Sequence, residues 1–189
     1  YYCGTFGTMM EPRLLLGDQQ IRLILKRFAH QLMEQHPDMD DLALIGLQPR
    51  GVMLSRLVYE ELKQLALPAL PYYGELDITF FRDDFNRGEL LVPKKNDINF
   101  STENKQVVLV DDVLFTGRSV RSALDAMLSF GRPSKVSLMV LVDRRFSREL
   151  PIAPDYTGIA VDTRAKLEQV KVSLSEQEYK VWIRETKQG

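Results

Sequence analysis

The sequence feature that most constrains the fold is an apolar run that ends in two adjacent carboxylates. Residues 107–110 are Val-Val-Leu-Val, and Asp111 and Asp112 follow directly. The turn Thr-Gly-Arg-Ser at residues 116–119 then precedes a helical pattern. A continuous apolar run is typical of a strand in a parallel sheet that helices cover on both faces. Because unpaired amides at a helix N-terminus bind anions and carboxylates accept hydrogen bonds from hydroxyls, this pattern predicts a site for a sugar phosphate.

Hydrophobic periodicity along the chain predicts alternating strands and helices. We expect helices at residues 18–36, 52–65 and 119–129, where apolar residues recur every three to four positions, with Asp18 as the first N-cap. We expect strands at residues 42–47, 73–81, 106–111 and 136–142, and a long loop at residues 85–102. Strands separated by helices imply a parallel sheet, and ligands bind beyond the carboxyl ends of such strands. Residues 48–51, 111–119 and 143–145 are expected to converge there.

Composition restricts the class of protein. The 189 residues, 44% of them hydrophobic, predict one domain over residues 11–189, with residues 1–10 as a lead outside the fold. A net charge of -1 excludes a bulk polycation. The single cysteine, Cys3, predicts a reducing, cytoplasmic location. No apolar segment approaches the roughly 20 residues that a membrane-spanning helix needs, so no membrane partner is expected.

Three other phosphate-linked motifs fit this chain poorly. The sequence has no Gly-x-x-x-x-Gly-Lys loop and no Gly-x-Gly-x-x-Gly fingerprint. The acidic pocket of a phospho-receiver domain draws its acids from two strands, whereas Asp111 and Asp112 are adjacent and are followed closely by residues 116–119. A site for a phosphorylated pentose therefore remains the best interpretation.

Residues 107–119 resemble the phosphoribosyl pyrophosphate (PRPP) loop of type I phosphoribosyltransferases. The wider chain resembles one branch, the bifunctional pyrimidine-operon attenuator and uracil phosphoribosyltransferase family. The segments that carry this resemblance are residues 18–30, 46–51, 74–84, 107–123, 131–134, 141–144 and 148–152. It implies an α/β type I phosphoribosyltransferase fold, with a central, mostly parallel sheet flanked by helices and a small C-terminal hood at residues 143–175.

The resemblance implies a reaction in which uracil and PRPP give UMP and pyrophosphate. Magnesium would be held through PRPP oxygens, with no direct protein ligand. The implied catalytic residues are Asp111 and Asp112, which would hold the ribose hydroxyls, and Arg82, which would neutralise pyrophosphate. The implied 5′-phosphate site is Val113, Leu114, Phe115, Thr116, Gly117, Arg118 and Ser119. The implied pyrophosphate loop is Pro49, Arg50 and Gly51, and the implied base contacts are Val142, Asp143 and Arg144.

Two departures from purine-specific relatives favour a pyrimidine. Those relatives usually carry an acid where this chain has Phe115 and a lysine where it has Asp143. A third departure concerns Pro49, because the family often has threonine there, beside a non-proline cis peptide. Proline lowers the cost of a cis bond from about 3 to below about 1 kcal/mol, so we predict a cis Gln48–Pro49 bond.

The family's second activity is UMP-responsive binding of pyrimidine-operon leader mRNA. Candidate RNA contacts are Lys26, His30, Arg145 and Arg148. Two alternatives stay open at this point: a phosphoribosyltransferase for orotate or a 6-oxopurine, and a catalytically silent RNA-binding regulator. The resemblance also implies a homodimer or a higher even oligomer.

Overall fold

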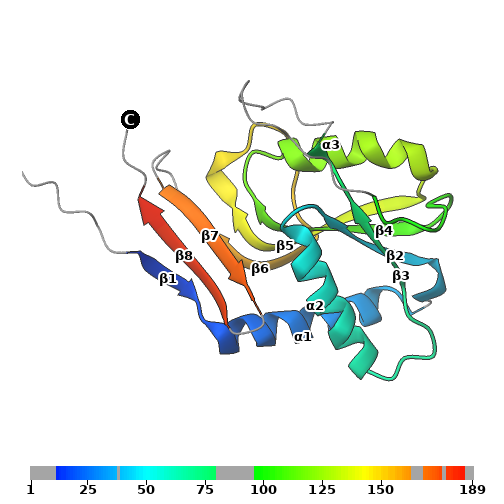
Figure 1. The fold of residues 1–189 in the computed structure, drawn as a ribbon, viewed down its shortest axis with the longest axis horizontal. Helices are drawn as coiled ribbons and strands as arrows, with labels where there is room; N and C mark the ends of the chain where they lie inside the picture. Colours follow the sequence, from blue (N-terminus) through cyan, green and yellow to red (C-terminus); the bar gives the residue numbers. More distant parts are fainter. Residues whose placement is uncertain (1–11, 38, 80–95, 163–167, 176–177, 186–189) are drawn as a thin grey trace, which may run out of the picture.

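The computed structural model describes residues 12–37, 39–79, 96–162, 168–175 and 178–185. A five-stranded parallel sheet in the order β3-β2-β4-β5-β6 lies beside a three-stranded antiparallel sheet in the order β1-β8-β7 (Figure 1). The main sheet contains β2 (Leu42–Leu47), β3 (Tyr72–Leu76), β4 (Gln106–Leu114), β5 (Lys135–Arg144) and β6 (Tyr156–Val161). The small sheet contains β1 (Arg13–Leu16), β7 (Glu168–Leu174) and β8 (Tyr179–Glu185). The helices are α1 (Asp18–Gln35), α2 (Gly51–Gln64) and α3 (Arg118–Met127), with short 3-10 turns η1 (Met39–Asp41), η3 (Leu128–Phe130) and η4 (Arg145–Ser147).

Helices cover both faces of the main sheet, as the sequence predicted. Val108 and Val110 of β4 pack in one hydrophobic cluster with α1 and α2, whereas Val107 and Leu109 pack in a second cluster with α3. Figure 1 shows α3 on one side of the sheet and the other two helices on the opposite side. Both faces of β4 are therefore buried, which explains why its sequence is continuously apolar instead of alternating.

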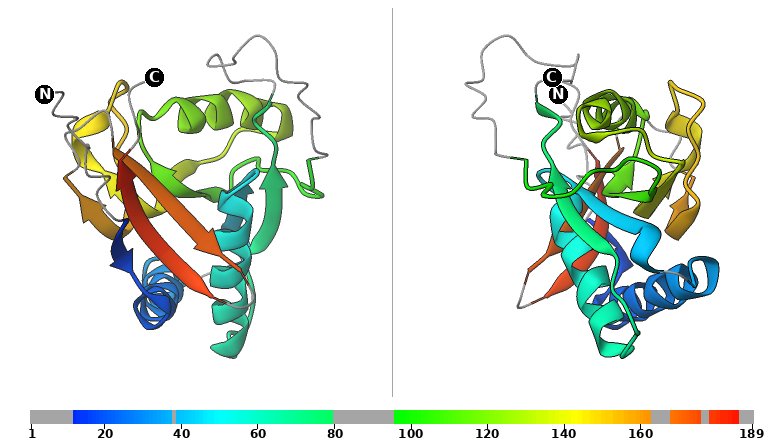
Figure 2. Two further views of the ribbon diagram at one scale, coloured as in Figure 1. Left: turned by 60° about the vertical axis from the view of Figure 1, so that its left-hand side comes forward. Right: turned by 90° about the vertical axis from the view of Figure 1, so that its right-hand side faces the viewer.

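The small sheet packs against the α1 side of the molecule. Val170 of β7 and Val181 of β8 belong to the same cluster as Phe28 of α1, and Figure 2 shows both strands crossing in front of the main sheet in its left view. The small C-terminal hood is present as this sheet, but its bounds differ from the expected residues 143–175. β6 is the edge strand of the main sheet, and the small sheet recruits β1 from the start of the fold. Pairing of β1 with β8 joins segments far apart in sequence, which periodicity does not reveal.

Backbone hydrogen bonds and strand pairing explain three of the boundaries that differ from expectation. Asp18 is the first residue of α1, and Gly17 is its N-cap, whose N–H donates to Oε1 of Gln20 at 2.9 Å. The strand expected at residues 73–81 ends at Leu76, because its partner β2 ends at the facing residue Leu47. The strand expected at residues 106–111 continues to Leu114, because β5 pairs with it that far.

The loop expected at residues 85–102 falls mostly outside the described residues. In the described part, Asp97 forms an isolated antiparallel bridge with Glu75, and their backbone N–H groups each donate to the other's carbonyl at 3.0 Å. Residues 96–102 are thus tied to the edge of β3. The lead expected at residues 1–10 also lies outside the described residues.

Candidate active site

A cavity of about 360 Å³ opens at the carboxyl ends of the parallel strands. Its walls come from the β2–α2 turn, the end of β4, the start of α3, the end of β5 and strand β7. The lining residues are Gln48, Pro49, Arg50, Ile78, Asp111, Asp112, Val113, Phe115, Ser119, Arg144, Gln169 and Val170. The convergence expected from the alternating pattern is therefore present in the fold.

Asp111 and Asp112 both line this cavity although they are neighbours on one strand. Pairing between β2 and β4 stops at Gly46 and Val110, so from Asp111 onward β4 has no strand partner on that side. The N–H of Asp112 donates to Oδ1 of Asp111 at 2.9 Å. Burial, and then the charge of Asp112, raise the pKa of Asp111 well above its usual value. Burial also raises the pKa of Asp112, and the positive charge of Arg50 opposes that rise.

Strand β4 leads directly into the turn at residues 115–117 and into α3. Gly117 is the N-cap of α3 and has a φ of 93°, in the left-handed region that favours glycine. A Cβ at this position would meet side-chain atoms of Leu150 and Ile152 at 3.3 and 3.2 Å. In the first turn of α3 the N–H of Arg118 donates to Oγ1 of Thr116 at 3.4 Å, and Ser119 lines the cavity.

The β2–α2 turn forms the wall that carries Pro49 and Arg50. The Gln48–Pro49 peptide bond is cis, as predicted, and the N–H of Gln48 donates to the carbonyl of Leu76 at 2.9 Å. Gly51 is buried against β4, where an added Cβ would lie 2.9 Å from Cα of Asp111. A smaller hollow of about 180 Å³ shares Pro49, Arg50 and Asp112 with the main cavity and extends toward Val172 of β7.

The opposite wall combines an aromatic ring, a buried cation and the small sheet. Phe115 is 44% exposed, and Cζ of Arg144 lies 4.2 Å from the centre of its ring. Burial lowers the pKa of Arg144. Gln169 and Val170 of β7 complete this side. No local motif in the sequence marks these two residues, because only the small sheet brings β7 to the cavity.

The candidate site residues divide into three groups. Eight lie in the cavity wall: Pro49, Arg50, Asp111, Asp112, Val113, Phe115, Ser119 and Arg144. The described residues outside the wall are Gly51, Leu114, Thr116, Gly117, Arg118, Val142 and Asp143. Leu114 is in the hydrophobic core, Val142 is buried, Arg118 pairs with Glu149 at 2.7 Å, and Asp143 pairs with Arg148. Gly51 is buried, Gly117 is the N-cap of α3, and the carbonyl of Thr116 accepts from Glu149 and Leu150. Arg82 lies outside the described residues.

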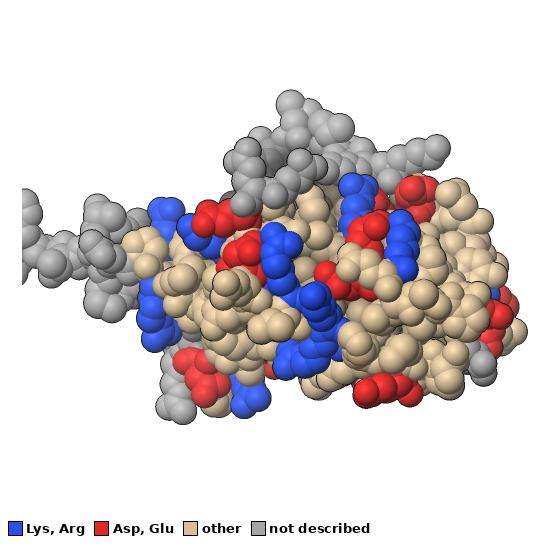
Figure 3. Space-filling view, turned by 90° about the horizontal axis from the view of Figure 1, so that it is seen from below, with Lys and Arg blue, Asp and Glu red and all other residues tan. Residues whose placement is uncertain are grey.

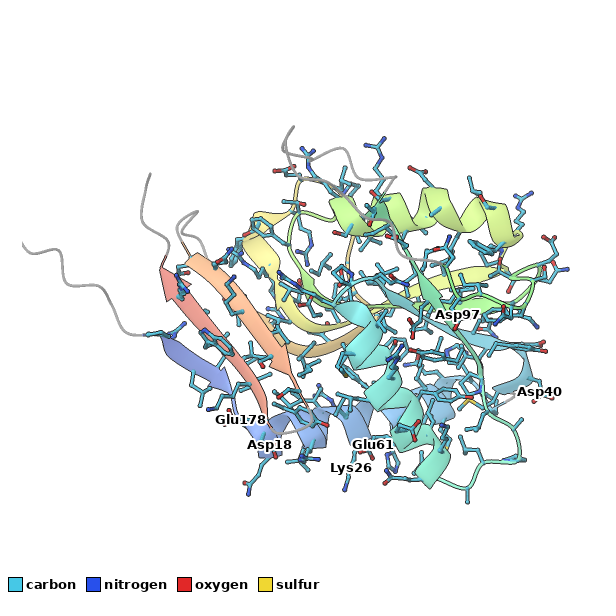
Figure 4. The ribbon with its side chains drawn as sticks, in the orientation of Figure 1. Asp18, Lys26, Asp40, Glu61, Asp97 and Glu178 are labelled. Atoms are coloured by element: carbon cyan, nitrogen blue, oxygen red, sulfur yellow. The ribbon has the colours of Figure 1, made fainter. Side chains whose placement is uncertain are left out.

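Three of the four candidate RNA contacts lie on the surface, and the fourth, Arg148, is mostly buried. Lys26, His30 and Arg145 are exposed, and Figure 4 shows Lys26 pointing outward from α1, on the same side of the molecule as Glu61. The guanidinium of Arg148 instead donates to backbone carbonyls inside the protein, which differs from the surface position that an RNA contact requires. Basic and acidic side chains lie next to one another on the face seen in Figure 3.

The described residues contain no group of three or more His, Cys, Asp or Glu side chains that could hold a metal ion. The cavity offers the adjacent carboxylates of Asp111 and Asp112. This donor set fits a magnesium ion that takes most of its oxygen ligands from a bound phosphate compound. Within the described parts of the chain, no helix is both long enough and apolar enough to cross a membrane.

Comparison with known proteins decides the family. Residues 15–177 match the model of the phosphoribosyl transferase domain. The chain is 46% identical over 169 residues to the bifunctional protein PyrR of Desulfosudis oleivorans, covering 88% of this chain and 92% of that protein. It is 40% identical over 171 residues to the bifunctional protein PyrR of Bacillus cereus, covering 89% and 93%. The chain belongs to the PyrR family of phosphoribosyltransferases.

Solved structures agree on the fold of the family. A hypoxanthine phosphoribosyltransferase from Staphylococcus aureus has a TM-score of 0.63 and 21% identity, covering 81% of this chain and 78% of that one. The Trypanosoma cruzi enzyme in complex with IMP has a TM-score of 0.60 and 19% identity, covering 81% and 77%. The type I phosphoribosyltransferase fold expected from residues 107–119 is confirmed.

Proposed function

We propose that this PyrR-family protein forms UMP and pyrophosphate from uracil and PRPP. The observation that supports the proposal most directly is the cavity itself. It combines two carboxylates, the start of α3 and the cis-proline turn, which suit the ribose hydroxyls, the 5′-phosphate and the pyrophosphate of one substrate. Magnesium, held mainly by PRPP oxygens, would balance the charge of the pyrophosphate.

Asp111 and Asp112 have two functions in this scheme. They accept hydrogen bonds from the 2′- and 3′-hydroxyls, and their charge favours the positive charge that develops on the ribose ring as the bond from C1 to pyrophosphate breaks. N1 of uracil then bonds to C1 and loses its proton to pyrophosphate or water. Positioning and charge stabilisation thus supply the catalysis. Hydrogen bonds donated by the ribose hydroxyls would favour the ionised form of Asp111, which opposes the burial that raises its pKa in the free protein.

The pyrimidine preference rests on the wall opposite the acids. Phe115 occupies the position at which purine-specific relatives usually carry an acid, and its ring lies against the guanidinium of Arg144. Asp143 occupies the position of their lysine, and its carboxylate forms an ion pair with Arg148. Neither side chain offers a purine the expected partner. Arg82 remains a proposed pyrophosphate ligand.

A radiolabelled-base assay with PRPP tests the proposal. Uracil, orotate, hypoxanthine and guanine are compared at equal concentration, with and without magnesium. We expect product only from uracil. Asp112→Asn should lose most of the activity, whereas Asp125→Asn, which removes an exposed carboxylate on α3, should retain it. Transfer to hypoxanthine or orotate would favour another base, and no transfer to any base would favour a silent regulator.

We also propose that the protein binds leader mRNA in a UMP-dependent manner. The name of the relatives records two functions, and Lys26, His30 and Arg145 are available on the surface. A gel shift with leader RNA, with and without UMP, should show binding that weakens steeply with salt. The Lys26→Ala, His30→Ala double variant should bind RNA more weakly than the Lys180→Ala variant. Lys180 is a lysine of β8 that pairs with Glu178.

The cytoplasmic location, the single domain over residues 11–189 and the even-numbered assembly are part of the same proposal. Light scattering coupled to size-exclusion chromatography measures the assembly directly. An odd-numbered species would contradict it.

A further inference from the structure

Arg148 lies four residues beyond the end of β5, and most of its side chain is buried. Its guanidinium meets four backbone carbonyls and one carboxylate. The two N–H groups of Nη1 are shared among three carbonyls, those of Leu114 and Arg144, each at 3.0 Å, and that of Phe115. Nε donates to the carbonyl of Ile152 at 3.0 Å, and Nη2 pairs with Asp143. The side chains of Arg148 and Asp143 are only 18% and 11% exposed. This pair therefore differs from exposed ion pairs, which stabilise little.

The acceptors belong to segments that meet at the phosphate loop, which we define as residues 115–119. Leu114 and Phe115 are at the entry to this loop, whereas Asp143 and Arg144 end the neighbouring strand. A guanidinium presents its N–H groups in a rigid planar fork, so it fixes the distances between the groups that it bridges. Lysine has one flexible donor centre and cannot reproduce this arrangement.

Residues that follow Arg148 support the same loop from behind. The N–H groups of Glu149 and Leu150 both donate to the carbonyl of Thr116, at 3.0 and 3.2 Å. Leu150 and Ile152 also limit the space at Gly117. The segment 148–152 is therefore a backing for the phosphate loop, and Arg148 is its most heavily bonded member.

We propose that Arg148, oriented by Asp143, is a positioning residue that holds the phosphate loop in the shape that receives the 5′-phosphate of PRPP. The inference rests on the proposed function. Arg148 is not among the described residues that line the cavity, so it acts through the loop backbone. The 5′-phosphate binds this loop equally before and during the transfer, so loss of the clamp should raise KM for PRPP more than it lowers kcat.

Steady-state kinetics of three variants test the clamp. Arg148→Ala should raise KM for PRPP about 10- to 100-fold, because a displaced loop misplaces the groups that bind substrate. Arg148→Lys and Asp143→Asn should raise it by smaller factors, with kcat changed less than KM in each. The matched control is Arg22→Ala, which removes an exposed arginine–carboxylate pair on α1 and should leave KM unchanged. Thermal midpoints are measured for all four, and Arg148→Lys and Asp143→Asn decide the matter if Arg148→Ala does not fold.

Chemical rescue adds a readout that a merely structural effect would not produce. Millimolar guanidinium chloride should lower KM for PRPP in Arg148→Ala, whereas methylammonium chloride at the same ionic strength should not. Unchanged KM for PRPP in the folded variants, or a fall in kcat alone, would overturn the inference. Calorimetric titration with PRPP separates the two proposals. If the wild type binds PRPP but does not transfer its ribose phosphate to uracil, the transferase proposal fails. The ratio of the PRPP dissociation constants of variant and wild type then still tests the clamp. A wild type that does not bind PRPP would refute both.

Discussion

Replacing Gly51 with alanine should separate α2 from β4 at the floor of the cavity. The added Cβ would lie 2.9 Å from Cα of Asp111 and 3.0 Å from the carbonyl carbon of Val110, and closer still to the carbonyl oxygen of Val110. All three atoms belong to the backbone of a central strand, so no side chain can rotate away. Carbon atoms pack best at about 3.5–4.0 Å, so the start of α2 must move by roughly 0.6 Å or more.

This displacement has a cost in stability and a larger cost in activity. Overpacking of this kind typically costs about 1–3 kcal/mol, which for a chain of this length lowers the melting temperature by about 2 to 12 °C. The same shift moves Pro49 and Arg50 relative to Asp111 and Asp112. A misplacement approaching 1 Å can lower kcat/KM by about 100-fold. The folded variant should therefore have a kcat/KM far below that of the wild type.

Differential scanning fluorimetry and the uracil transfer assay measure both effects on the same preparation. The matched control is Gly17→Ala at the N-cap of α1, where the nearest atom to an added Cβ is Oε1 of Gln20 at 3.9 Å. That variant should keep wild-type activity. A Gly51→Ala protein with unchanged melting temperature and kcat/KM would refute the argument from close approach.

Three further predictions concern the acids, the metal and a buried polar contact. The raised pKa of Asp111 means that the folded protein binds this proton more tightly than the unfolded chain, so wild-type stability falls as pH rises from about 4 through the folded pKa. Asp111→Asn should therefore lose activity yet melt higher than wild type at pH 8, with the difference vanishing near pH 4; an equal difference at both values would count against this cause. Excess EDTA should abolish transfer without changing the melting temperature, and magnesium should restore it, since the described residues hold no three-ligand metal cluster; a large drop in melting temperature would instead reveal a resident metal. Tyr156→Phe should cost about 1–3 kcal/mol at unchanged kcat/KM, because the hydroxyl donates to Oε1 of Gln35 at 2.7 Å and lies 3.1 Å from Nε2 of buried His36; chemical denaturation measures the loss, and unchanged stability would contradict it.

Local patterns in the sequence were sufficient to predict most of the main sheet. The apolar run before Asp111 is a strand covered on both faces, and the three predicted helices are present with ends shifted by no more than a few residues. The cis bond before Pro49 was also predictable, because proline lowers the free-energy cost of a cis peptide bond. These features depend on side-chain periodicity and on backbone preferences that act over a few residues.

The sequence by itself therefore determined the layered α/β sheet, the acidic pair and the phosphate turn. Only the tertiary structure decided that β7 closes the cavity with Gln169 and Val170, that β1 joins the small sheet, and that Arg148 is taken up inside the protein. Arginine has the same side chain whether it faces solvent or bridges four carbonyls. Its role depends on contacts between segments distant in sequence, and the free energy of packing the whole chain selects those contacts.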